Sequence, residues 1–192
     1  MRKITKVSLG AAAVGILLAA SVSPSMADTV ESTVSGSTLT ATTAGATLTG
    51  VTLNGTGTQT ATGTSAQWTL TDARGTGAAW TVSVSATTPT SAAGTVETTA
   101  RTIAVSNLSI TPGTITATAG SDPAAGITAP TLTLATTSQA LISASATHKG
   151  SYNLTPSFSL AVPANAFRSN YSGAVGSTAL NPYISTVTYT IG

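Results

Sequence analysis

The sequence predicts an all-β protein, an antiparallel β-sandwich or a barrel-like single domain that follows a cleaved signal peptide. Thr and Val, whose branched side chains fit a pleated sheet, recur throughout residues 28–192, and charged residues make up only 6% of the chain. Turn signals built from Gly, Pro and Asn separate short alternating runs at intervals of about 8 to 12 positions, which is typical of antiparallel sandwiches and barrels. The chain has no cysteine, so its core and its sheet hydrogen bonds must hold the domain together.

The first 27 residues are typical of an export signal. Arg2, Lys3 and Lys6 form a basic start, residues 7–22 are mostly apolar, and Ser25-Met26-Ala27 offers small residues for a cleavage site. A membrane-spanning anchor requires ~20 continuous apolar residues, and this run is shorter. We therefore expect cleavage after residue 27 and a secreted, extracellular protein.

Removal of this leader changes the charge of the protein. Three of the seven basic residues lie in the leader, so four basic and five acidic side chains remain in residues 28–192, and the net charge by count is −1. The basic residues that remain are not clustered. Nucleic-acid binding, which depends on clustered Lys and Arg along a phosphate backbone, is therefore not expected.

The rest of the chain divides into a lead-in and a β domain. Residues 28–46 are rich in Thr and Ser and form either an edge strand or a flexible lead-in, and residues 47–192 form the domain. Thr87–Thr99 and Gly120–Pro130 are expected loops because they contain Pro and Gly. The expected strands are residues 47–53, which run into an Asn54-Gly55 turn, the segments on both sides of Asp72–Gly77, and residues 101–105, 108–110, 114–118, 132–134, 140–146, 152–162 and 183–191.

Both tryptophans lie in the stretch QWTLTDARGTGAAWTVSV, on either side of a turn at residues 72–77. Asp72 can cap backbone N–H groups there, and the glycines supply positive φ angles or a bulge. If this is a hairpin with an odd-numbered loop centred on Arg74, Trp68 faces Trp80 on one side of the sheet, together with Leu70. A two-residue loop shifts the register by one and places the indoles on opposite faces.

The first register suits a core, because Trp80, Val82 and Val84 then share one face of the strand. Large side chains are scarce in this chain, and burial of each indole contributes roughly 4 to 6 kcal/mol before entropy. The alternative is an exposed indole that stacks on a sugar. Asp72 and Arg74 are expected to form an ion pair at the tip of the turn.

The residues needed for catalysis are few and scattered. His148 is the single histidine, and it lies in a polar segment that reads as a hairpin turn, with no acid or serine arranged around it as a triad requires. The five carboxylates suggest neither a sugar-cleaving pair nor a calcium loop. We expect a protein that is not an enzyme, with no cofactor and no metal site.

The chain resembles the WxL-domain family of Gram-positive surface proteins from about residue 48 to its end. The residues that carry the resemblance are Leu53-Asn54-Gly55, Trp68-Thr69-Leu70, the turn Asp72-Ala73-Arg74-Gly75-Thr76-Gly77 with Trp80 after it, the region 150–159, Val162-Pro163-Ala164-Asn165-Ala166 and the terminal stretch 183–191. The second WxL motif of the family falls where this chain has Tyr189-Thr190-Ile191, and the chain carries an insertion between Ala166 and Tyr183.

The resemblance implies an all-β domain that attaches non-covalently to the cell wall through peptidoglycan. The residues that match its motifs are Trp68, Leu70, Asp72, Arg74, Trp80, Tyr183, Tyr189 and Ile191, and they are the candidate binding residues. Binding is expected at the tip formed by residues 72–77 or on the sheet face beside it. The alternative function is a structural subunit of an extracellular fibre or coat that assembles when the lead-in adds as a strand to a neighbour; self-association or contact with other surface proteins would follow.

Overall fold

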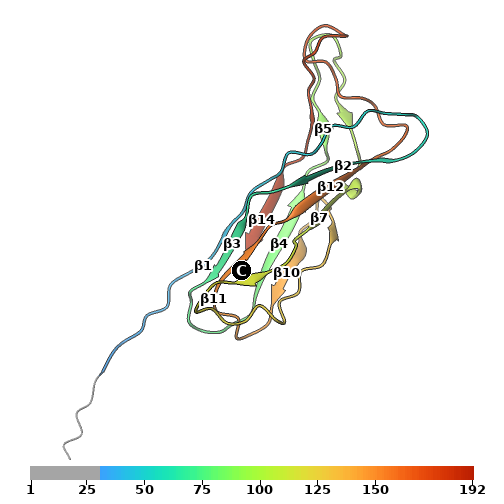
Figure 1. Ribbon diagram of the computed structural model, residues 1–192. Coiled ribbons are helices and arrows are strands. Elements are labelled where there is room, and N and C mark those ends of the chain that lie inside the picture. Colours follow the sequence, from blue (N-terminus) through green and yellow to red (C-terminus); the bar gives the residue numbers. More distant parts are fainter. Residues whose placement is uncertain (1–30) are drawn as a thin grey trace, which may run out of the picture. The chain divides into compact units, whose positions relative to one another are not determined.

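The computed structural model describes residues 31–192 (Figure 1). The expected signal peptide, residues 1–27, lies outside the described residues. Residues 35–192 form one compact unit that is almost entirely β-structure, which confirms the predicted fold class. Its sheets do not close into a barrel, so the domain is sandwich-like. No helix within residues 31–192 has the length and apolar character needed to span a membrane.

The strands are β1 (Leu39–Thr42), β2 (Gln59–Thr64), β3 (Trp68–Asp72), β4 (Trp80–Ala86), β5 (Thr90–Ser91), β6 (Arg101–Thr102), β7 (Leu108–Thr111), β8 (Thr116–Ala117), β9 (Leu132–Thr133), β10 (Gln139–Ala144), β11 (Gly150–Leu154), β12 (Ser157–Val162), β13 (Tyr183–Ile184) and β14 (Val187–Ile191). A 3₁₀ helix, η1 (Val105–Asn107), precedes β7.

One layer of the sandwich is built on a long, bent antiparallel ribbon. β3 pairs with β11 and β2 pairs with β12, so residues 59–72 run beside residues 150–162. The register shifts by one residue where Pro156, which has no N–H to donate, interrupts the second segment; the N–H of Ser65 donates to the Pro156 carbonyl there at 2.9 Å. β1 and β8 flank the β3–β11 half, while β7 and β9 extend the β2–β12 half beyond β12.

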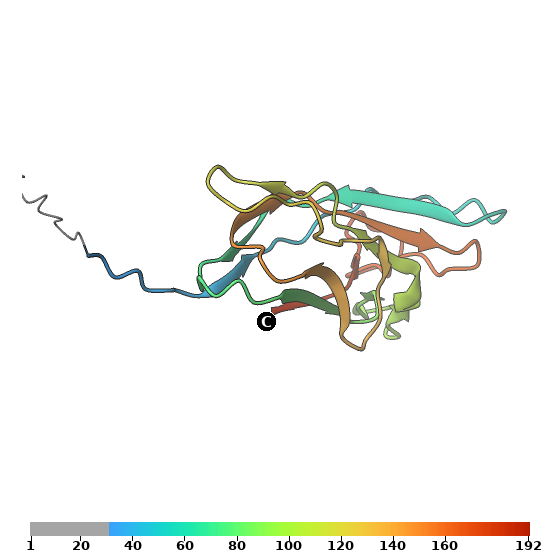
Figure 2. The same ribbon diagram turned by 90° about the horizontal axis from the view of Figure 1, so that it is seen from below.

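The second layer follows the same plan. β4 pairs with β14 and β5 pairs with β13, while β10 lies on the other side of β4 and β6 on the other side of β5. The strand β14 is therefore the edge of its sheet, and β1 of the first layer lies beside it. Figure 2 shows the cyan β2 and the orange β12 in one layer and the red β14 in the other.

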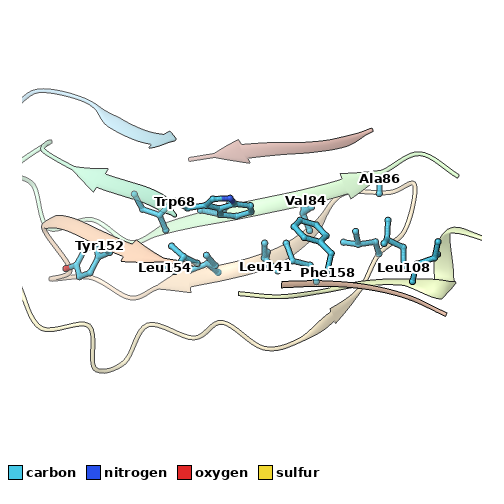
Figure 3. Close-up of a cluster of buried hydrophobic side chains, with 14 of the residues drawn as sticks. Trp68, Val84, Ala86, Leu108, Leu141, Tyr152, Leu154 and Phe158 are labelled. Atoms are coloured by element: carbon cyan, nitrogen blue, oxygen red, sulfur yellow. The ribbon is translucent and has the colours of Figure 1, made fainter. Parts of the chain in front are cut away.

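The core fills the space between the two layers because every second residue of the central strands points inward. In β3 and β4 the buried and half-buried residues alternate without interruption. Figure 3 shows side chains from both layers meeting in this core, with the Trp68 indole near the middle. The buried apolar residues are Ala61, Trp68, Leu70, Trp80, Val82, Val84, Ala86, Ile103, Leu108, Ile110, Leu134, Leu141, Ile142, Ala144, Tyr152, Leu154, Phe158 and Leu160.

The predicted hairpin between the two tryptophans is wrong. The strand β3 pairs with β1 and β11, whereas β4 pairs with β10 and β14, so the turn carries the chain from one layer of the sandwich to the other. Neither of the two registers considered for a hairpin therefore applies. The alternation of side chains was nevertheless correct, because each strand is half-buried against the same core whatever its neighbours are.

The strand predicted at residues 47–53 is also absent. Leu48, Val51 and Leu53 are half-buried, and Leu48 and Val51 pack against the core, but this segment has no strand beside it over its length. Within the described residues, the N–H of Thr49, which donates to the Thr62 carbonyl at 2.8 Å, makes the one backbone–backbone hydrogen bond of residues 43–53. Apolar spacing alone does not produce a β-strand here, because no neighbouring strand supplies the hydrogen bonds.

The remaining differences concern where strands break. Residues 152–162 and 183–191 are each interrupted once, and residues 101–105 are strand only at Arg101–Thr102 before η1 begins. The expected loop 87–99 contains the short strand β5, which pairs with β13 and β6. Of the lead-in, residues 39–42 form the edge strand β1 on β3, and Ser37 and Thr38 continue this contact through backbone hydrogen bonds with Ala73. Residues 31–35 precede this contact and are exposed.

Candidate functional site

The turn after β3 is organised by a buried carboxylate. The side chain of Asp72 is 0% exposed, and it accepts the backbone N–H of Arg74 at 3.0 Å and the Nε and Nη2 of the same residue at 2.9 Å each. Hydrogen bonding to this guanidinium lowers the pKa of Asp72 below its ordinary value. Gly75 and Gly77 both adopt positive φ. The expected cap and ion pair are confirmed, and their contacts lie within the turn itself.

The two indoles hold distant segments together. Trp68 and Trp80 are 0% and 2% exposed, so the burial prediction is confirmed and stacking of these indoles on a sugar is excluded. The Nε1–H of Trp68 donates to the Ala44 carbonyl at 3.0 Å, and that of Trp80 donates to the His148 carbonyl at 3.0 Å. Each tryptophan thus fixes a loop that lies far away in the sequence.

The candidate residues of the last two strands lie elsewhere in the domain. The Tyr189 ring meets the Trp68 indole edge to face, with 4.6 Å between ring centroids. Leu70 and Trp68 share the inner face of β3, and Ile191 is half-buried at the end of β14. Tyr183 lies in β13 and is therefore separated from the Asp72 turn by most of the length of the sandwich (Figure 1). The motif residues consequently do not form one continuous binding surface.

A groove opens between the two layers on the β14 side. Its volume is about 800 Å³, and three segments line it: residues 43–53 form one wall, residues 180–189 form the other, and β12 provides part of the floor. Tyr183 and Tyr189 are the only candidate residues from the sequence that line it. Trp68 lies behind the groove, because it bonds to Ala44 in one wall and packs on Tyr189 in the other.

The mouth of the groove carries exposed apolar side chains, which we call the mouth patch: Phe167, Leu180, Ile184 and the adjoining Arg101. The three apolar residues are 50–63% exposed. The guanidinium of Arg101 lies 4.0 Å from the centroid of the Phe167 ring, a cation–π contact. Within residues 31–192 the guanidinium of Arg101 forms no ion pair, so its charge is available to a ligand.

A polar network fixes the loop that carries the mouth patch. Asn170 is buried, and its Nδ2 donates to the carbonyls of Ala92 at 3.0 Å and Thr99 at 2.8 Å. Glu97 pairs with Arg168, and this hydrogen bonding lowers the pKa of the carboxyl. These contacts bind residues 163–182 to the segment between β5 and β6. Sequence reasoning missed this site, although Phe167 and Tyr171 within the insertion were a signal that could have indicated it.

Tyr189 brings an unsatisfied polar atom to the groove. Its hydroxyl is buried and has no hydrogen-bond partner among the described residues, and burial raises its pKa above the ordinary value. Most buried polar groups in native proteins have a partner. Because this hydroxyl is closed off from solvent, the unsatisfied atom belongs to the packed layer beneath the groove wall.

His148 is a buried structural residue. Its Nδ1 lies 3.0 Å from the Ser145 carbonyl oxygen and its Nε2 lies 3.0 Å from the Ala125 carbonyl oxygen, and these carbonyls raise its pKa. The expected turn is present, with Thr147 at positive φ, but it is not a hairpin because β10 and β11 belong to different sheets. In the part of the chain that the structure describes, no three metal-binding side chains come together.

Comparisons with known proteins leave the family of the chain open. No family model matches it, and no curated protein or solved structure matches it either. The resemblance to WxL domains accordingly remains a prediction from the sequence.

Proposed function

We propose that this protein is a secreted, non-catalytic surface protein that associates non-covalently with the bacterial cell wall through peptidoglycan. The mouth patch is the observation that supports the proposal. Soluble proteins seldom expose large apolar side chains side by side, and such clusters are commonly sites of interaction. Here three of them, Phe167, Leu180 and Ile184, line the mouth of one groove on the domain.

The chemistry of the mouth patch suits a polymer made of sugars and short peptides. The exposed Phe167 ring offers an apolar surface on which the face of a sugar ring or an alanine methyl group packs. The adjoining Arg101 offers a guanidinium that binds carboxylates through two parallel hydrogen bonds. Peptidoglycan contains each of these groups, so apolar and charge-assisted contacts would form side by side.

The motif residues have a supporting role in this proposal. Trp68 and Trp80 are buried, and Asp72 and Arg74 satisfy one another. They act by fixing the turn between the layers and the wall at Ala44, and they do not touch the polymer. This differs from the expectation that binding occurs at the tip of residues 72–77.

Sedimentation with purified peptidoglycan sacculi tests the proposal. Residues 28–192 are expected to pellet with the sacculi, and Phe167→Ala and Arg101→Ala are each expected to weaken binding roughly tenfold, the effect of losing one charge-assisted or aromatic contact of about 1.4 kcal/mol. Val96→Ala is the matched control, because Val96 is 60% exposed but lies outside the groove lining. Complete recovery of the folded protein in the supernatant would contradict the proposal, and equal binding by all variants would move the site elsewhere.

A further inference from the structure

The strand β14 has a free edge that faces the groove. Thr81 and Gly192 exchange both backbone hydrogen bonds, at 2.8 and 3.1 Å, which fixes the parity of the antiparallel β4–β14 ladder. Because hydrogen-bonded and non-hydrogen-bonded pairs alternate in such a ladder, the N–H and C=O groups of Val187 and Tyr189 point away from β4. An unpaired row of this kind is a template for another strand.

The seam between the two layers, on the side where β1 and β14 lie beside each other, is covered over only part of its length. The strand β1 lies beside β14 and covers the seam as far as Thr42. Residues 43–53 form the far wall of the groove and, apart from Thr49, make no backbone–backbone hydrogen bond to the described residues. The floor, which includes the largely buried Phe158 and Leu160, therefore lies beneath two segments that form no ladder with each other. The groove has the form of a sandwich seam that lacks one covering strand.

We infer that this groove receives an extended strand from a second copy of the chain, the exposed residues 31–35 that precede the backbone pairing of Ser37 and Thr38 with Ala73. This inference goes beyond the proposed wall binding and does not depend on it. The lead-in strand pairs with the free edge at Val187 and Tyr189, and its alternate side chains, Val34 among them, enter the groove. Such strand addition is an established mode of protein association.

The free part of the lead-in fits the groove in length and polarity. Extended at about 3.3 Å per residue, residues 31–35 reach roughly 16 Å, and the free edge at residues 187–189 spans roughly 10 Å. Val34 is 95% exposed, the highest value among the large apolar residues of the described chain.

The connectivity of the chain favours a neighbouring copy over the same molecule. The lead-in joins β1 at Leu39, whereas the groove begins at Thr43, at the opposite end of the same strand. To enter its own groove the lead-in would have to reverse before Ser37, which is bonded to Ala73, and then run past the whole of β1, which lies beside β14 along that path. A second molecule meets no such obstacle, and each copy then offers both a groove and a strand.

Analytical ultracentrifugation of residues 28–192 tests the inference. Concentration-dependent association is expected, and Val34→Glu is expected to weaken it at least about tenfold, because it would place an unpaired charge in an apolar groove. Thr33→Glu is the matched control: it adds the same charge to the neighbouring residue, whose side chain points away from the groove, and it is expected to associate like the unmodified chain. Both positions are exposed, so neither variant is expected to disturb the fold.

Cysteine cross-linking locates the contact. The chain has no cysteine of its own, so every disulfide formed must involve an introduced cysteine. A mixture of Val34→Cys and Ile184→Cys chains is expected to form a mixed disulfide under mild oxidation, whereas a mixture of Val34→Cys and Val96→Cys chains is not. A monomer at every concentration overturns the inference. The inference is also overturned if Val34→Glu and Thr33→Glu change the association equally, or if neither changes it. Equal cross-linking in the two cysteine mixtures overturns it as well. Wall binding by a strictly monomeric protein would leave the proposed function intact while refuting strand exchange.

Discussion

Replacement of Trp68 by Phe tests whether the indole holds the wall of the groove. The variant loses the Nε1–H that donates to the Ala44 carbonyl, a hydrogen bond whose net contribution is about 1 kcal/mol. It also loses apolar ring area equivalent to one or two buried methylene groups, about 1 kcal/mol, and part of the edge-to-face contact with Tyr189, about 1 kcal/mol. We expect the free energy of unfolding to fall by about 3 kcal/mol.

Urea unfolding measures this loss, and amide hydrogen exchange locates it. The midpoint should fall with little change in the m-value, and the Thr49 amide, which bonds to the Thr62 carbonyl, should exchange faster as the wall loosens. Trp80→Phe is the matched control, because it also loses an indole hydrogen bond, but to the His148 carbonyl and not to the groove wall. If both variants change Thr49 exchange equally, or if Trp68→Phe costs less than about 1 kcal/mol, the indole does not hold the wall.

Three further predictions concern single side chains. Two carbonyl contacts raise the pKa of His148 above 6.5. Its contribution to stability is therefore complete below about pH 6.5 and is lost as the pH rises through the folded-state pKa. Thermal melts of His148→Gln should lack this decline, and a pH profile identical to that of the unmodified chain would contradict the assignment. Gly63→Ala drives a Cβ into the Thr47 carbonyl oxygen and should lower the free energy of unfolding by about 1–3 kcal/mol. Gly45→Ala, whose Cβ meets nothing within 4 Å, should change it little in the same urea titration. Tyr189→Phe removes a hydroxyl that has no partner in the described residues, so stability should stay constant or rise by about 1 kcal/mol, and a clear loss of stability on urea unfolding would reveal a partner.

The alternation of side chains could be predicted from the sequence because it depends on local spacing. In β4, Trp80, Val82 and Val84 were expected on one face, and that face is buried. The Asp72 cap and its pair with Arg74 were equally local, since the two residues are separated by one position. Each of these predictions needs no knowledge of which strands are neighbours.

Strand pairing could not be predicted, because the partners are distant in the chain. Thr69 in β3 bonds to Asn153 in β11, 84 positions away. A turn such as Asp72–Gly77 looks the same in sequence whether it joins two strands of one sheet or carries the chain between two layers. Only the pairing partners distinguish these cases, and a single sequence does not name them.

The groove was hidden for the same reason. Its walls come from residues 43–53 and 180–189, and its floor comes partly from β12. Residues 47–53 were expected to form a strand because apolar residues precede the Asn54-Gly55 turn, and apolar residues in an unpaired groove wall give the same local signal. The mouth patch depends on Asn170 and Glu97, whose structural roles appear only when the insertion folds onto the β5–β6 segment.

The pairing of β4 with β14 also has a consequence for the rate at which the protein folds. The amide of Thr186 reaches the hydroxyl of Thr87, 99 positions earlier, so the second layer cannot form until residues 187–191 are available to it. Domains dominated by such distant contacts fold in milliseconds to seconds, far more slowly than helical bundles. A chain whose second layer forms this late would stay incompletely folded for a long time, and the secretion proposed above would require an unfolded chain.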